Sequence, residues 1–140
     1  MAQGDLIDFG RKYGNDLGLL LTSRYSFGSQ VSPDITKFTV EMINATPIEV
    51  IAEFLPGLEA HEKTQALSAM LNTEVLVMVG ESDIQTPPEH SAEIARLLPN
   101  AELQILPETG HMIMLERNSE VTHALLILID RVRERAGLAS

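Results

Sequence analysis

The chain has 140 residues, a formal net charge of −10 at pH 7 and a sequence pI near 4.7. Its apolar content of 44% and charged content of 21% are typical of one globular domain with a moderate core. The acidic balance argues against nucleic acid and anionic membrane surfaces as partners, because both require clustered Lys and Arg. The sequence contains no cysteine, which excludes disulfides, thiolate metal sites and cysteine nucleophiles.

Helix signals, and no convincing strand, fill the part of the sequence before about residue 70. Four helices are predicted there: over residues 4–21, from Pro33 onward, from Pro47 to about Phe54, and over residues 59–69. Ser32 and Thr46 stand where N-capping side chains are expected, and each is followed by a proline, which suits the first helical position. We interpret residues 1–69 as a helical, cap-like region without a sheet of its own.

The pattern changes in residues 70–140. A β-branched apolar run closed by glycine, residues 74–80, predicts a strand buried on both faces, and residues 101–107 alternate as a second strand. Thr86-Pro87-Pro88-Glu89 is expected to cap a helix running to about Leu98 between them. Asn118-Ser119-Glu120 is expected to cap a final helix reaching roughly Arg135. This order predicts an α/β fold with a β-α-β-α unit of a parallel sheet.

Two polar residues follow the two predicted strands. Asp83 comes after the first strand in VGESD, and His111 comes after the second in LPETGH. Sites on parallel sheets lie beyond the carboxyl ends of the strands, so the two loops are expected to meet. A carboxylate beside an imidazole orients the ring and stabilises its protonated form. Taken separately, each residue is more often a turn, cap or loop residue, and their joint placement favours function.

Residues 75–121, VLVMVGESDIQTPPEHSAEIARLLPNAELQILPETGHMIMLERNSEV, resemble the C-terminal third of an α/β-hydrolase. The resemblance rests on the Gly-x-x-Asp that ends the first strand, the Thr-Pro-Pro that opens the helix, and Gly-His followed by Leu-Glu-Arg. It implies a partial α/β-hydrolase fold and a cofactor-independent hydrolase that cleaves an ester or related acyl bond. It also implies that Asp83 is the acid and His111 the base of a Ser-Asp-His mechanism. Residues 1 to about 68 resemble the helical cap of such enzymes less specifically.

The nucleophile of that mechanism is missing from the sequence. No G-x-S-x-G elbow and no HGGG-type oxyanion loop occur, and the nearest lookalike, GESDI, has Ile84 in place of the second glycine. Four serines offer hydroxyls without elbow context: Ser29, Ser68, Ser82 and Ser91. Loss of the serine from such a triad costs on the order of a million-fold in turnover. We therefore expect this chain to be inactive alone.

Two predicted strands make a poor sheet, and the first would present an unpaired apolar edge. We expect either a fragment of a longer enzyme, or a chain completed by an N-terminal partner or by a second copy of itself. In the complete enzyme the partner is a small-molecule ester or acyl substrate. Two alternatives are a non-catalytic binding or oligomerisation module from a truncated hydrolase, and one half of a split enzyme.

No metal, nucleotide or other cofactor is expected. The four histidines, His61, His90, His111 and His123, show no metal-ligand spacing. His90 and Glu93 are one helical turn apart, as solvated surface pairs commonly are. Glu81 and Asp83 after Gly80 would repel a phosphate.

Two further features lie beside His111. Residues 112–115 are expected to pack the chain into the final helix or, less often, to line an acyl pocket. Glu116 and Arg117 are expected to form a local ion pair or cap, or to contact the missing half of the fold.

The start of the chain, residues 1–14, lacks the apolar segment of a signal peptide, and no apolar run reaches the length of a membrane span. We therefore expect a cytoplasmic protein with no membrane span. If Met1 is an internal methionine of a longer reading frame, the missing signal peptide carries no information about localisation.

Overall fold

A computed structural model describes residues 19–61 and 63–138. Its helices and strands are α2 (Pro33–Asn44), α3 (Ile48–Glu59), the 3-10 helix η1 (Thr64–Met70), β1 (Val75–Gly80), α4 (Pro88–Leu97), β2 (Ala101–Leu106), α5 (Ile113–Glu116) and α6 (Asn118–Arg135). Residues 19–26 are helical as well, and residues 4–18 of the predicted first helix lie outside the described ranges.

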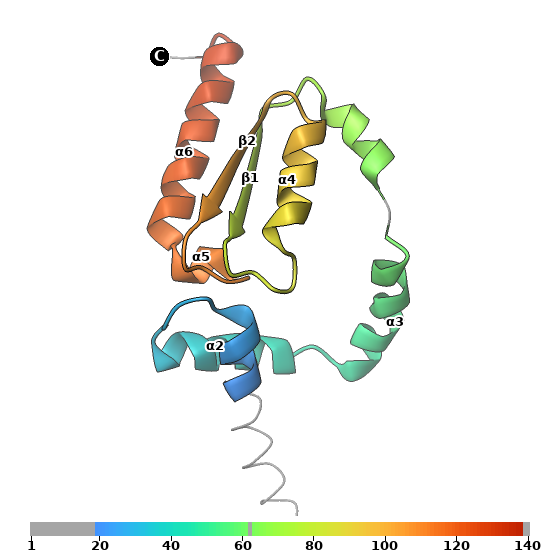
Figure 1. The fold of residues 1–140 in the computed structure, drawn as a ribbon, viewed down its shortest axis with the longest axis vertical. Coiled ribbons are helices and arrows are strands. Elements are labelled where there is room, and N and C mark those ends of the chain that lie inside the picture. Colours follow the sequence, from blue (N-terminus) through green and yellow to red (C-terminus); the bar gives the residue numbers. More distant parts are fainter. Residues whose placement is uncertain (1–18, 62, 139–140) are drawn as a thin grey trace, which may run out of the picture.

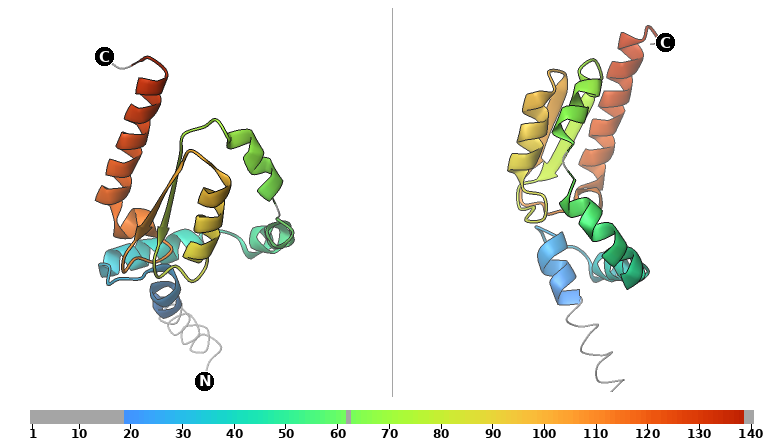
Figure 2. Two further views of the ribbon diagram at one scale, coloured as in Figure 1. Left: turned by 45° about the horizontal axis from the view of Figure 1, so that its top comes forward. Right: turned by 90° about the vertical axis from the view of Figure 1, so that its right-hand side faces the viewer.

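The two strands form a parallel pair in the register Val75↔Ala101 to Gly80↔Leu106. Helix α4 connects them and contacts both, whereas α6 contacts β1 from the opposite side (Figures 1 and 2). The predicted α/β class and the β-α-β-α order of residues 70–140 are confirmed. The pairing brings the carboxyl ends of both strands, Gly80 and Leu106, to one edge of the sheet.

The helical part of the chain lies across this carboxyl-terminal edge. Residues 19–26 and α2 run below the loops that leave β1 and β2, and α3 and η1 lead back beside α4 to the start of β1 (Figure 1). Helix η1 contacts α4. The amide of Met112 donates a hydrogen bond of 3.0 Å to the carbonyl of Ser26, which joins the two regions of the chain beside His111. Residues 19–26 and α2 therefore lie on the side of the sheet where the two strands end.

The apolar core of the described residues is small. Its buried members are Phe27, Val79, Leu98 and Ala124. Large apolar side chains are exposed along α6, among them Leu126, which is 55% exposed, and Val132, which is 46% exposed. Burial of such side chains supplies most of the folding free energy of a domain. The sheet and α6 thus present apolar surface that the described residues do not cover.

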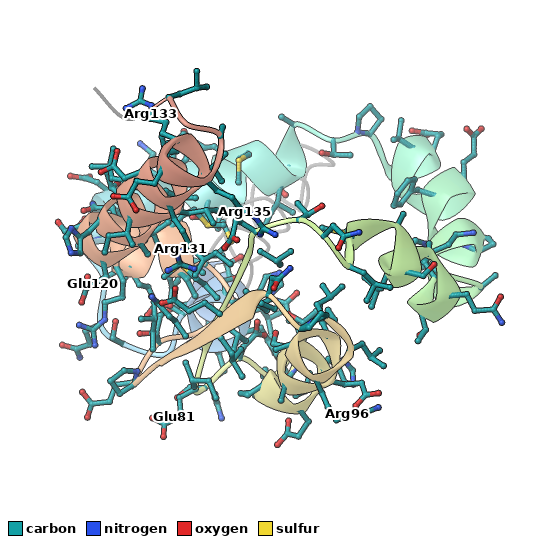
Figure 3. The ribbon with its side chains drawn as sticks, turned by 90° about the horizontal axis from the view of Figure 1, so that it is seen from above. Glu81, Arg96, Glu120, Arg131, Arg133 and Arg135 are labelled. Atoms are coloured by element: carbon teal, nitrogen blue, oxygen red, sulfur yellow. The ribbon has the colours of Figure 1, made fainter. Side chains whose placement is uncertain are left out.

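Ion pairs hold α6 against the amino-terminal end of the sheet. Arg131 Nη2 lies 2.6 Å from Glu102 Oε2 on β2, and Arg135 pairs with Glu74, which precedes β1. Figure 3 shows Arg131 and Arg135 on the side of α6 toward the strands, whereas Arg133 points away. Because these side chains are partly exposed, solvent screens each pair and its contribution to stability is small.

Several predicted helix boundaries were wrong. Helix α3 continues through Pro56 and ends at Glu59, not at Phe54. A proline removes one helical hydrogen bond but does not prevent the next turn from closing. The amide of Ala60 closes that turn with a hydrogen bond of 3.1 Å to the carbonyl of Pro56. The helix predicted over residues 59–69 is the tighter 3-10 helix η1, which begins at Thr64.

The predicted caps were right at one helix and wrong at three. The Ser32 side chain accepts a hydrogen bond of 3.4 Å from the amide of Ile35, as expected. Helices α3 and α4 instead have Pro47 and Pro87 at their N-caps, and α6 has Arg117; none of the three makes a side-chain cap bond. A threonine two residues before a helix can serve another partner, and the next subsection shows that Thr86 does.

No helix in the described ranges combines the length and the apolar character needed to cross a membrane.

Candidate active site

Asp83 lies in the loop that follows β1, and only 5% of the residue is exposed. Its Oδ1 accepts hydrogen bonds of 2.9 Å from the backbone amides of Gln85 and Thr86. Its Oδ2 accepts a hydrogen bond of 2.8 Å from the Thr86 hydroxyl. These bonds form a tight turn of four residues, in which a carboxylate replaces the carbonyl that a backbone turn would use. The turn holds the carboxylate in one orientation.

His111 lies in the loop that follows β2, and its Nδ1 is 2.9 Å from Oδ2 of Asp83. The same nitrogen lies 3.3 Å from the Thr86 hydroxyl oxygen. The side chain of His111 is 35% exposed, whereas that of Asp83 is 4% exposed. The structure therefore brings the two predicted site residues together, although 28 positions separate them in the chain.

Burial of Asp83 raises the pKa of its carboxyl, but hydrogen bonds to the carboxylate outweigh this effect and lower the pKa below 3.8. The donors are the Thr86 amide, His111, the Thr86 hydroxyl and the Gln85 amide. The group is therefore an ionised carboxylate at neutral pH and can only accept hydrogen bonds. His111 must donate its Nδ1–H to Oδ2. In the neutral ring, Nε2 then carries the lone pair and can take a proton.

Glycines allow the two loops to pack backbone against backbone. A Cβ on Gly80 would lie 2.2 Å from the carbonyl oxygen of Thr109, a separation that no side chain can adopt. The amide of Ser82 donates a hydrogen bond of 2.9 Å to that same carbonyl. Gly110 is equally confined, because a Cβ there would lie 2.4 Å from the amide nitrogen of Gly28. The relative position of the Asp83 and His111 loops therefore depends on the absence of side chains at these contacts.

Two residues beside Asp83 and His111, Thr86 and Glu116, have partners that differ from those expected from the sequence. Thr86 was predicted as a helix cap, and its hydroxyl instead binds Asp83. Glu116 was predicted to form a local pair or cap or to contact the missing half of the fold, and its carboxylate accepts hydrogen bonds from Gly28, Ser29 and Gly110 within this chain. The local ion pair is made by Arg117 with Glu120, at 3.2 Å. The sequence shows that Thr86 and Glu116 are polar residues close to Asp83 and His111. It does not show which groups their side chains bind.

Three of the other candidate groups, Ser29, Ser68 and Glu93, have structural partners. The Ser29 hydroxyl donates to Glu116, and that of Ser68 donates to the carbonyl of Gln65. Glu93 pairs with Arg96 at 2.7 Å, rather than with His90. Within the described ranges, no group of three or more His, Cys, Asp or Glu side chains is arranged to hold a metal ion.

Known proteins resemble this chain in sequence and in fold. Residues 53–127 match an α/β-hydrolase family described as TAP-like protein. The putative non-heme bromoperoxidase BpoC of Mycobacterium tuberculosis is 32% identical over 89 residues, which are 62% of this chain and 34% of that protein. The chain therefore matches about a third of the length of this curated relative.

Two solved structures share the fold. One is the serine hydrolase CarC, involved in carbazole degradation, with a TM-score of 0.61 and 16% identity over 80% of this chain and 45% of CarC. The other is a thermophilic esterase, with a TM-score of 0.59 and 23% identity over 88% of this chain and 49% of the esterase. The predicted partial α/β-hydrolase fold is confirmed, and the chain spans just under half of each of these structures.

Proposed function

The chain belongs to the TAP-like protein family of α/β hydrolases, and from this premise we propose that it supplies the acid and the base of a Ser-Asp-His hydrolase. The bond to be cleaved is an ester or a related acyl bond. Asp83 is the acid and His111 the base. The observation that carries the proposal is the 2.9 Å contact between Nδ1 of His111 and the buried carboxylate of Asp83.

Each residue has a defined step in this mechanism. Asp83 accepts the Nδ1–H of His111 and keeps Nε2 unprotonated, so Nε2 can take the proton of a serine hydroxyl as that oxygen attacks the acyl carbon. The imidazolium, stabilised by Asp83, then gives this proton to the departing alcohol. Water attacks the acyl-enzyme in the second half, with His111 again accepting and returning a proton, and an acid is released.

The serine must come from outside this sequence, since the 140 residues contain no G-x-S-x-G elbow. An upstream segment of the same polypeptide, or a complementing N-terminal chain, would supply it together with the neighbouring strands. In support, the chain matches only about a third to a half of the length of its relatives. We hypothesise that the 140 residues alone do not hydrolyse esters.

A second candidate is a non-catalytic binding or oligomerisation module. It is favoured by the sheet of the described residues, which has two strands and therefore two unpaired edges, and by the exposed apolar side chains of α6. Sedimentation analysis of the purified chain distinguishes the candidates in part. A stable homodimer that binds acyl ligands without turnover would support the module.

The decisive experiment compares the 140-residue chain with a longer polypeptide that includes the coding region upstream of Met1. Both are assayed with a fluorogenic ester, each as wild type, as His111→Ala and as His90→Ala. His90 is an exposed histidine at the start of α4 and serves as the matched control. We expect turnover only in the longer polypeptide and its loss only in His111→Ala. Turnover by the short chain that depends on His111 would contradict the inactivity hypothesis. A longer polypeptide that is active and indifferent to His111→Ala would contradict the mechanism.

A further inference from the structure

The carboxylate of Glu116 joins two segments that are distant in the sequence. Its Oε2 accepts hydrogen bonds from the Gly28 amide at 3.1 Å, the Ser29 amide at 2.9 Å and the Ser29 hydroxyl at 2.7 Å. Its Oε1 accepts a hydrogen bond of 2.7 Å from the amide of Gly110, the residue directly before His111. Four donors on one carboxylate are a full complement for an ionised side chain.

From this arrangement we propose that Glu116 is a positioning residue for His111, acting through the backbone of Gly110. The inference rests on the proposed function, because it gives Glu116 a role toward the proposed base. Glu116 does not touch Asp83 or the ring of His111 in any of these bonds, so its effect on the base is indirect.

The packing around Gly110 makes this contact effective. Thr109 is completely buried, and a Cβ on Gly110 would lie 2.6 Å from the carbonyl carbon of Phe27. The backbone before His111 therefore packs closely against residues 27–28. Glu116 accepts hydrogen bonds from both of these segments, at Gly110 and at Gly28. A carboxylate is suited to the position because its oxygens both accept, whereas an amide side chain has one accepting oxygen and one donating nitrogen.

The same contacts connect the helical segment to the proposed acid and base. Residues 27–32 link the helical residues 19–26 to α2, and Glu116 holds this link at Gly28 and Ser29. On the acid side, the Gln85 side-chain amide donates a hydrogen bond of 3.1 Å to the carbonyl of Tyr25. A displacement of this helical segment would therefore be transmitted to the backbone before His111.

The test is nuclear magnetic resonance of the 140-residue chain, with three variants beside wild type. Glu116→Gln keeps the shape of the side chain and loses one acceptor, and Ser29→Ala removes only the hydroxyl donor. Glu134→Gln, at an exposed position on α6, is the control. The readouts are the His111 Nδ1–H signal, the ring tautomer from nitrogen shifts, and hydrogen exchange of the Gly110 amide.

In Glu116→Gln we expect a weakened Nδ1–H signal, a mixed tautomer, and Gly110 exchange faster by about ten-fold or more. Ser29→Ala should shift the same signals less, and Glu134→Gln should leave them unchanged. Unchanged His111 signals in Glu116→Gln would overturn the proposal. Loss of all β1 and β2 amide signals in that variant would also overturn it, because Glu116 would then support the fold as a whole. Absence of the Nδ1–H signal in wild type would instead contradict the proposed acid–base pair.

Discussion

The Thr86 hydroxyl donates a hydrogen bond of 2.8 Å to Oδ2 of Asp83, the oxygen that also lies 2.9 Å from Nδ1 of His111. The carboxylate thus receives its local support from within its own turn. Because this hydroxyl favours the charged form, Thr86 helps to keep Asp83 ionised beside the ring.

Thr86→Val retains the shape of the side chain and removes that hydroxyl. We expect the pKa of Asp83 to rise toward its ordinary value and the protein to lose about 1.5–3 kcal/mol of stability, the range for one hydrogen bond to a charged group. Carbon-13 titration of the Asp83 carboxyl measures the first effect, and urea unfolding the second. Thr122→Val, at an exposed position on α6, is the control. An unchanged Asp83 titration would show that the Thr86 hydroxyl does not affect the charge state of Asp83.

The lowered pKa of Asp83 predicts a pH dependence of stability. A carboxyl whose pKa is lower in the folded than in the unfolded state stabilises the fold above its unfolded pKa, near 3.8, and this contribution is lost as the pH falls through the folded pKa. Urea unfolding followed by circular dichroism between about pH 2 and pH 6 should therefore show stability falling below about pH 3.8. Asp83→Asn should make the curve flatter in that window. Parallel curves for wild type and variant would contradict the assignment.

Asp83→Asn also tests the orientation of the proposed base in a longer polypeptide that hydrolyses esters. An amide keeps the size of the carboxylate but lets the ring adopt the wrong tautomer, so turnover should fall by on the order of 10⁴-fold, the loss typical of such triads. Single-turnover ester cleavage separates this loss from a change in substrate binding. A loss confined to KM would indicate that Asp83 serves the binding of substrate.

The contact between the acid and base loops predicts different tolerance at two glycines. Gly80→Ala places a Cβ against the carbonyl of Thr109 and should destabilise the protein by about 1–3 kcal/mol, as overpacking does. Gly57→Ala in α3 is the matched control, because a Cβ there meets nothing within 4 Å; it should stabilise the helix by about 0.5–1 kcal/mol. Thermal unfolding measures both. Equal changes in stability for the two variants would mean that the loops after β1 and β2 accommodate the added Cβ without loss of stability.

Those parts of the fold that depend on residues close together in the sequence could be predicted from it. Strands β1 and β2 were recognisable because apolar runs bounded by turn residues specify buried strands locally. Asp83 and His111 were found because parallel strands place their following loops at one edge, so topology alone brings the two residues together. The end of α3 was misplaced because proline lowers the local helical preference, whereas the following turn still closes.

The roles of Thr86 and Glu116 depended on the path of the chain in space. A threonine before Pro-Pro-Glu has one hydroxyl that fits either a helix cap or a nearby carboxylate, and the turn at Asp83 brings the carboxylate within reach. Glu116 meets Gly28 and Ser29 across 88 and 87 positions, so no periodicity or spacing could reveal the contact. Local chemistry in the sequence thus identified the strands and pointed to Asp83 and His111 as candidate site residues. The residues that hold those groups in place became visible only in the folded chain, because their hydrogen bonds join segments that only packing brings together.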